Sequence, residues 1–205
     1  GMTVGALAQL FNAERKLGVE LHVVKMEGWR RDFWFDSTGL EWINPSPNMR
    51  SLVAAALYPG VCLLETTNLS VGRGTDRPFE LIGAPWLDGR RLAEELNKRN
   101  IPGARFVPVR FRPESSKFAG EACSGVSIIV IDRAALKPVR LGIEIAVALR
   151  RLHPETWKIE DYGRLLVNRK TLEMLKSGEE AEAIERSWQV PLDEFRQIRQ
   201  KYLLY

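Results

Sequence analysis

The chain has 205 residues, of which 45% are hydrophobic and 27% charged, and its formal net charge is +4. This length suffices for one large or two small domains with a buried core. Basic and acidic residues are interleaved without a basic block, which argues against a nucleic-acid partner, and no apolar run approaches the ~20 residues of a membrane span.

Cysteine and histidine are too few and too scattered for a metal centre. Cys62 and Cys123 lie in apolar or small-residue surroundings without a CxxC spacing, so we expect buried free thiols. His22 and His153 are the only histidines, and no cofactor is expected. We expect no signal peptide, because the chain opens on an amphipathic helix, and the sequence fits a cytoplasmic and an exported location alike.

The first elements of the chain are predicted to be a helix and a strand. Thr3 is a favourable N-cap, apolar residues follow at helical spacing as far as Phe11, and Gly18 ends the helix. Residues 19–24 alternate between apolar and polar side chains, which is typical of a half-buried strand with His22 on its polar face.

A long connection rich in aromatic residues follows. It contains Trp29, Phe33, Trp34, Phe35 and Trp42. Connections of this length are usually functional, and aromatic faces pack well against sugars, but a small satellite core beneath the loop explains the same residues. These rings and the helix residues Leu7 and Phe11 would need a cover, either a second copy of the chain or an N-terminal region.

A second helix and a buried strand are predicted next. Two prolines keep residues 44–48 extended, and Asn48 is the expected cap of a helix that ends before Pro59 and Gly60. The apolar run that leads to Glu65 suits a strand covered on both faces. The strands at 19–24 and 61–65, with the helix between them, would form a parallel unit.

The polar stretch of residues 65–80 is the centre of the predicted site. It would leave the carboxyl end of a parallel strand, where such sheets bind ligands. Gly72 and Gly74 allow close approach of the backbone to a ligand, and Pro78 keeps the stretch from forming a helix. Its many hydrogen-bonding groups favour a binding loop over a plain connection. They are Glu65, Thr66, Thr67, Asn68, Ser70, Arg73, Thr75, Asp76 and Arg77.

Two interpretations are open for Arg73 and Arg77. Guanidinium groups hold planar carboxylates in a bidentate manner, so both arginines suit a sugar that carries a carboxylate. Alternatively, either arginine pairs with Asp76 or Glu80 and fixes the loop.

The pattern changes at residue 83, and residues 83–205 are predicted to form an α+β domain that ends in helices. A helix is expected at 88–99, and strands are expected at 107–111 and 126–131. Between the strands lies a second polar loop, residues 114–121, which could face the first.

Motifs of several common enzyme classes are absent. Gly72 and Gly74 are followed by Pro78 and no helix, so they form neither a dinucleotide fingerprint nor a phosphate loop. No G-x-S-x-G elbow is present, which argues against a serine hydrolase. What remains is carboxylate chemistry. Glycoside hydrolysis needs a proton donor at the leaving oxygen and usually a second carboxylate, although such groups are more often salt-bridged than catalytic.

Short motifs along the whole chain follow the order of one known family. They are G-M-T-V-G-A-L-A at 1–8, G-W-R-R at 28–31, W-F-D-S-T-G-L at 34–40, P-S-P-N-M at 45–49, L-Y-P-G at 57–60, T-N-L-S-V-G-R-G-T-D-R-P-F-E at 67–80, G-A-P-W at 83–86, S-K-F-A-G-E at 116–121 and Y-L-L-Y at 202–205. They resemble the bacterial exo-β-N-acetylmuramidases of peptidoglycan recycling, glycoside hydrolase family 171, long known as domain of unknown function 1343.

This resemblance implies a fold, a reaction and a site. The fold would be the end of a Rossmann-like parallel-sheet domain, residues 1–82, followed by a smaller α+β domain, residues 83–205. The reaction would release N-acetylmuramic acid from the non-reducing end of peptidoglycan fragments, in a cleft between the domains. The alternative is a non-catalytic carbohydrate-binding or assembly module of the same family. The expected catalytic residue is Glu65, and the expected sugar-binding residues are Asn48, Asn68, Ser70, Arg73, Thr75 and Arg77.

Three positions depart from the family pattern. Thr66 replaces the glycine of E-G-T-N, and Val71 replaces a glutamate, which removes a carboxylate from the expected binding loop. Ala6 also stands where the family favours glutamate; that residue would complete a capping box with Thr3, so the change should cost about 0.5–1 kcal/mol of helix stability. The chain would begin late in the first domain, and family catalytic residues located earlier in it would be missing.

Overall fold

The computed structural model describes residues 1–205, which form two compact units. Unit 1 consists of residues 1–41 and 186–205, and unit 2 consists of residues 42–185. The helices are α1 (Val4–Glu14), α2 (Leu52–Val61), α3 (Gly89–Lys98), α4 (Pro138–Leu152), α5 (Ile159–Leu166), α6 (Arg169–Lys176), α7 (Ala181–Ser187) and α8 (Gln189–Gln200), and there are 3₁₀ turns η1 (Phe35–Thr38) and η2 (Cys62–Leu64). None of the helices is both long and apolar enough to cross a membrane.

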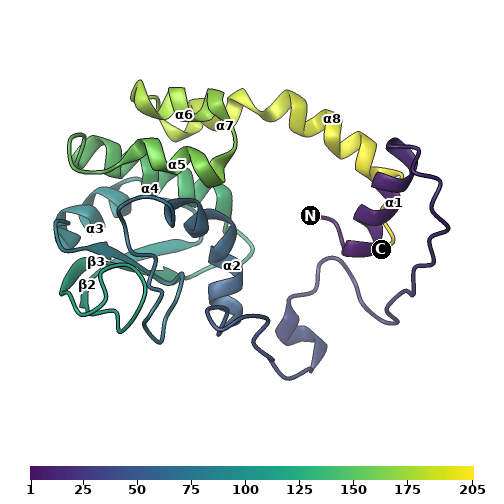
Figure 1. Cartoon of the computed structure of the whole chain (residues 1–205), viewed down its shortest axis with the longest axis horizontal. Helices are drawn as coiled ribbons and strands as arrows, with labels where there is room; N and C mark the ends of the chain where they lie inside the picture. The colour runs from purple at the N-terminus through teal and green to yellow at the C-terminus, as the bar shows by residue number, and fades with distance from the viewer. The chain divides into compact units, whose positions relative to one another are not determined.

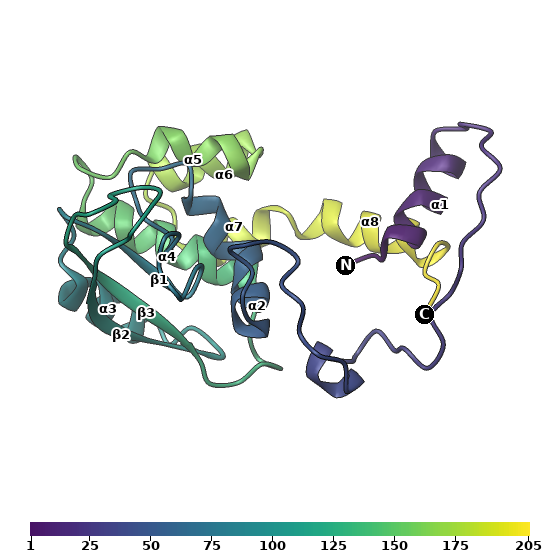
Figure 2. The same ribbon diagram turned by 60° about the horizontal axis from the view of Figure 1, so that its bottom comes forward.

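Unit 2 contains a three-stranded antiparallel sheet in the order β1-β3-β2 (Figures 1 and 2). The strands are β1 (Leu81–Ala84), β2 (Ala104–Phe111) and β3 (Cys123–Val130). The two strands predicted after residue 100 are confirmed. Together with the helices, the sheet confirms a mixed α/β fold.

Helix α3 covers one face of this sheet. Asp88 caps the helix as predicted, because its carboxylate accepts the amides of Arg90 and Arg91 at 3.0 and 3.1 Å. The Ser124 hydroxyl of β3 accepts the amide of Gly89 at 3.0 Å and so fixes the start of α3 on the sheet. Ser127, on the opposite face of β3, contacts the polar loop instead, which places that loop on the other side of the sheet.

Helices α2 and α4 cross at two glycines. A Cβ atom at Gly60 would lie 1.9 Å from the carbonyl oxygen of Pro138, and one at Gly142 would lie 2.5 Å from that of Gly60. This contact explains why α2 continues past Pro59, where the sequence predicted its end. A helix-interior proline costs about 3 kcal/mol, and the close packing of two backbones offsets that cost.

Charged side chains connect α4 to the elements on either side of it. In Figures 1 and 2, α4 lies between the sheet and the pair α5 and α6. Arg99, at the end of α3, donates to Glu144 of α4 at 2.8 Å and to Glu180 before α7 at 3.1 Å. Arg140 of α4 also pairs with Glu144, so two arginines neutralise this buried carboxylate. A buried charge is tolerated only when it is paired in this way.

Unit 1 consists mainly of α1, η1, α8 and irregular chain. Thr3 caps α1 as predicted, and its hydroxyl accepts the amide of Ala6 at 3.2 Å. The Tyr202 hydroxyl donates to Glu14 at 2.7 Å and joins the two ends of the chain. Leu10 and Ala6 are the only apolar residues of this unit that are buried.

The prediction of two parallel strands, at 19–24 and 61–65, is wrong. Residues 19–24 form no strand, and Val24 is 95% exposed, because no other strand lies beside them to complete a hydrogen-bonded ladder. Residues 61–65 belong to the end of α2 and to η2. Val61 and Leu64 are fully buried while the two residues between them are partly exposed, which is helical spacing, and so short an apolar run does not distinguish a strand from a buried helix.

Candidate functional site

The polar stretch of residues 65–80 is a loop, as predicted, but it follows a 3₁₀ turn and not a strand. Gly72 and Gly74 have φ angles of 78° and 81°, and Phe79 has a φ of 64°. The amide of Phe79 donates to the carbonyl of Val71 at 2.7 Å and closes the loop on itself. Only glycine adopts such angles without strain, so Phe79 is held in place by its surroundings.

Glu65 and Arg73 pair with each other. Glu65 is the cap of η2, and one oxygen of its carboxylate accepts a hydrogen bond from the Arg73 guanidinium. The two side chains are 28% and 38% exposed, so a ligand could reach both. The Arg73 guanidinium also lies 6.0 Å from the ring centre of Phe79. The charge of Glu65 adds to burial in raising the pKa of the neighbouring Cys62 thiol. Both cysteines are free thiols, as predicted, but only Cys123 is buried, and Cys62 is partly exposed.

Arg77 pairs with Glu80. This is the second of the two interpretations given for the arginine, in which it fixes the loop. Its guanidinium donates to the Glu80 carboxylate at 3.2 and 3.3 Å and to the Ser127 hydroxyl at 3.0 Å. The other oxygen of Glu80 accepts the hydroxyl of Ser51 at 2.7 Å. Ser51 is also the N-cap of α2, the position predicted for Asn48, so this network connects the loop to α2 and the sheet.

Three other predicted binding residues make bonds within the fold. The side-chain nitrogen of Asn68 donates to the Thr156 carbonyl at 2.9 Å, and its side-chain oxygen accepts the backbone amide of Lys158 at 2.8 Å, which fixes the loop to the chain before α5. Ser70 is buried and accepts the amide of Gly72. Thr75 donates to the Gly72 carbonyl at 2.6 Å and accepts the amide of Arg77, as in a tight turn.

The second polar loop meets the first, as predicted. The amide of Glu114 donates to the carbonyl of Gly74 at 2.8 Å. A Cβ atom at Gly74 would lie 2.1 Å from the Ser115 carbonyl oxygen, so only glycine allows the two backbones to come this close.

A pocket of about 640 Å³ lies where the two loops meet. Its walls come from three segments of unit 2. They include Pro47, Asn48 and Arg50, then Gly74, Thr75 and Asp76, and then Phe111, Arg112, Glu114 and Ser115. Of the predicted site residues, the pocket therefore contains Asn48 and Thr75, whereas the pair of Glu65 and Arg73 lies in the adjoining part of the loop.

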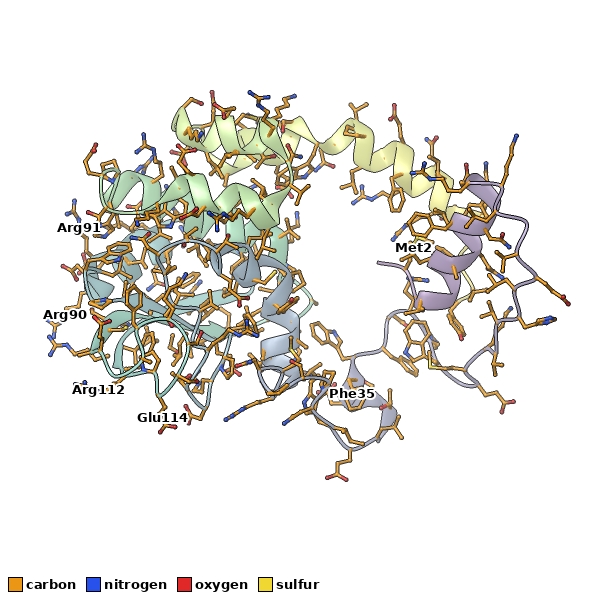
Figure 3. The ribbon with its side chains drawn as sticks, viewed as in Figure 1. Met2, Phe35, Arg90, Arg91, Arg112 and Glu114 are labelled. Atoms are coloured by element: carbon orange, nitrogen blue, oxygen red, sulfur yellow. The ribbon has the colours of Figure 1, made fainter.

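The charged groups of this pocket were largely missed by sequence reasoning. Asp76 and Glu114 are exposed, and their carboxylates make no hydrogen bond or ion pair. Arg50 and Arg112 donate only to main-chain carbonyls, those of Pro47 and Gly120. In Figure 3, the side chains of Arg112 and Glu114 project outward from this part of unit 2. Asp76 and Glu114 lie in the two predicted polar loops, and the one sequence signal of Arg112 is the change from apolar to charged residues at the end of β2.

The chemistry of the pocket suits a polar ligand with several groups that donate and accept hydrogen bonds. Two guanidinium groups supply donors, two free carboxylates supply acceptors, and the ring of Phe111 supplies one apolar wall. In unit 1, a separate pocket of about 470 Å³ is lined by two aromatic residues and three charged ones, which are Trp29, Tyr205, Arg30, Arg31 and Asp32. That pocket contains part of the aromatic connection for which a sugar-binding role was one prediction.

Comparisons with known proteins identify relatives over the whole chain. Residues 56–205 match the family model described as exo-β-N-acetylmuramidase NamZ, C-terminal, and residues 1–53 match the corresponding N-terminal model. The chain is 39% identical over 208 residues to the peptidoglycan β-N-acetylmuramidase NamZ of Bacillus subtilis strain 168, covering 100% of this chain and 50% of that protein. The chain thus spans about half the length of the curated relative it matches.

Two solved structures have a similar fold. Both are described as DUF1343 family proteins from Bacteroides fragilis NCTC 9343. One has a TM-score of 0.78 and 30% identity, and the other has a TM-score of 0.73 and 25% identity. Each comparison covers 100% of this chain and 56% of the solved chain. The family models together cover nearly all residues, and the chain therefore belongs to the exo-β-N-acetylmuramidase NamZ family.

Proposed function

We propose that this chain is part of a glycoside hydrolase that releases N-acetylmuramic acid from the non-reducing end of peptidoglycan fragments. The observation that carries the proposal is the 39% identity to the B. subtilis β-N-acetylmuramidase, which extends over the whole chain. The two-loop pocket supports it, because its guanidinium groups, carboxylates and hydroxyls are the groups that bind an acidic sugar.

Within that enzyme, we assign sugar binding to the loops of unit 2. N-acetylmuramic acid carries a lactyl carboxylate, and a guanidinium binds such a group well. Arg73 would bind it in exchange for Glu65, its partner in the structure. Glu65 would then be released to act as an acid or base near the sugar. Arg77 would shape the loop through Glu80 and Ser127.

A second candidate function is a carbohydrate-binding module without catalysis of its own. One observation favours it: the Glu65 carboxylate is engaged by Arg73, so the expected catalytic group is not free. In this case the chain would bind muramyl sugars, and the catalytic groups would lie in the half of the family protein that this chain does not match.

A release assay distinguishes the two functions. A chromogenic β-N-acetylmuramide is incubated with the chain alone and with the chain joined to the unmatched half of the B. subtilis relative. Release by the chain alone would establish that it contains the catalytic groups. Release only by the joined protein, with sugar binding by the chain alone, would support the binding role. Neither release nor binding in either protein would overturn both functions.

Arg73→Ala tests the binding site itself. It should weaken binding of N-acetylmuramic acid and leave binding of N-acetylglucosamine, which lacks the lactyl carboxylate, nearly unchanged. Isothermal titration calorimetry measures both. Arg90→Ala is the control, because Arg90 is an exposed arginine on α3, far from the loop in sequence (Figure 3). Equal losses for both sugars, or a large drop in melting temperature, would assign Arg73 to loop structure alone.

We also propose that the first part of the chain, predicted as residues 1–82, is the end of a Rossmann-like domain whose sheet lies in the rest of the family protein. The match of residues 1–53 to the N-terminal family model supports this proposal. The division of the chain at residue 82 stays a prediction. A structure of the joined protein in which residues 1–53 do not contact a parallel sheet would contradict it.

A further inference from the structure

Lys117 bonds to the main chain of the first polar loop from the second. Its ammonium group donates to the carbonyl oxygen of Glu65 at 2.9 Å and also to that of Thr67. These bonds join residues that are about fifty positions apart in the sequence. Because the donor is charged, each bond is stronger than one between neutral groups.

The backbone on both sides of Lys117 is strained. Ser116 has a φ of 69° and Phe118 has a φ of 61°. The residues immediately before and after the lysine therefore both occupy the left-handed region, although neither is glycine. Such conformations persist only where the surrounding structure requires them, and they cluster at binding and catalytic sites. These strained residues flank the lysine that bonds to the main chain of residues 65 and 67.

The surroundings of Lys117 are partly desolvated and acidic. Burial lowers the pKa of Lys117, while the carboxylates of Glu65 and Asp161 raise it. The ammonium therefore lies close to the carboxylate that we assign to the sugar site. An ammonium has three N–H donors, and the bonds to Glu65 and Thr67 use two of them.

The two loops are thus attached at two points. One is the contact of Gly74 with Glu114 and Ser115, and the other is Lys117. Residues 65–74, which include the pair of Glu65 and Arg73, lie between these attachments. On this side, Thr66 and Asn68 also bond to the chain at 156–161, and Lys117 adds the attachment to the second loop.

We propose that Lys117 is a positioning residue of the sugar site, which holds the main chain at Glu65 and Thr67 so that Glu65 and Arg73 are presented to the ligand. This inference deepens the proposed function and rests on it. Lys117 acts through the backbone of its neighbours and need not touch the sugar.

Three variants test the inference. Lys117→Met keeps the aliphatic stem and removes the ammonium, whereas Lys117→Arg keeps a charged donor. Lys170→Met is the control, because Lys170 is an exposed lysine on α6 whose side chain makes no bond. For each protein, calorimetry measures binding of N-acetylmuramic acid, and hydrogen exchange measures protection of the Thr67 and Thr75 amides, which lie inside the loop.

We expect Lys117→Met to weaken sugar binding at least tenfold and to speed exchange of both amides at least tenfold. Lys117→Arg should restore most of the binding, and Lys170→Met should change neither quantity. If the parent chain binds the sugar and Lys117→Met binds it equally well, the inference is wrong. If neither the parent chain nor the joined protein binds the sugar, the proposed function fails, and unchanged amide exchange in Lys117→Met would separately overturn the positioning role. If Lys117→Met does not fold, Lys117→Gln, which keeps a neutral donor, is judged by the same limits.

Discussion

Units 1 and 2 contain similar patterns of apolar residues but bury them to very different extents. The largest fully buried side chains all belong to unit 2, among them Leu57, Leu64 and Tyr162. In unit 1, by contrast, Leu7 is 41% exposed and Phe11 is 46% exposed, although both lie on the apolar side of a capped helix. The difference teaches that an amphipathic pattern gives a helix its form, whereas stability depends on what covers the apolar side.

The helix crossing of unit 2 gives the largest expected effect. Gly60→Val places a side chain against the backbone of α4, so the helices must separate, and we expect a loss of about 3 kcal/mol or more in the free energy of unfolding. Urea unfolding measures it. Gly5→Val in α1 is the matched change in unit 1, where the atom in the way is a side-chain carbon of Val23. Equal effects of the two substitutions would contradict the comparison.

A pair of leucines tests the difference in burial directly. Leu57→Ala removes a fully buried side chain and should cost about 3 kcal/mol, the middle of the range for core leucines. Leu7→Ala in unit 1 should change the stability of the chain by less than about 0.5 kcal/mol, because 41% of the residue's surface is already exposed to water. Thermal and urea unfolding measure both. A large loss for Leu7→Ala would show that a second copy of the chain covers α1, and light scattering would then detect the dimer.

Substitutions at the N-caps of α2 and α1 should differ less in the stability that they cost. Ser51→Ala removes the bond to the Ala54 amide and the bond to Glu80, and it should cost about 1–2 kcal/mol. Thr3→Ala removes only the bond to the Ala6 amide and should cost about 0.5–1 kcal/mol of α1 stability. Amide exchange of α1 and α2 measures each loss locally. If Ser51→Ala costs no more than Thr3→Ala, the bond to Glu80 does not stabilise unit 2.

The smallest effect concerns pH and His153. Burial lowers the pKa of His153, Arg91 lowers it further, and Asp88 raises it. Because the unfolded chain takes up a proton near the ordinary pKa of 6.5 and the folded chain only at lower pH, the unfolded state binds more protons in that interval. Stability should therefore fall as the pH drops below 6.5, and His153→Gln should flatten this dependence. Urea unfolding between pH 5 and about 8 measures the slopes, which should coincide at the alkaline end. An unchanged slope in the variant would show that His153 does not contribute.

The elements predicted correctly are those whose signals are local. Asp88 and Thr3 cap helices because their side chains reach amides two or three residues away, and the strand of 107–111 alternates by itself. The strand predicted at 61–65 failed because an apolar run does not reveal whether a helix or a sheet buries it. The continuation of α2 past Pro59 depends on Gly142, eighty residues later, and no local rule contains that contact.

For the candidate site as well, the sequence predicted the features with local signals and missed those that depend on distant contacts. The location of the site in residues 65–80, and the meeting of this loop with residues 114–121, followed from polar composition. The partners followed only in part: Glu80 was one of two carboxylates predicted for Arg77, whereas Glu65 was not predicted for Arg73, because the choice of partner depends on loop conformation. Lys117 was part of a quoted motif, but its bonds to the first loop depend on left-handed angles at two non-glycine residues, which sequence patterns do not indicate.

Unit 1 is built from both ends of the chain, with Tyr202 bonded to Glu14 and the hydroxyl of Tyr205 bonded to the amide of Met26. During synthesis on the ribosome, α1 therefore emerges long before α8 exists, and its apolar side must wait while residues 42–185 are made. Unit 2, whose contacts all lie within one continuous stretch, can fold in that interval. The order of synthesis thus imposes an order of assembly: the continuous unit first, and the unit that needs both ends last.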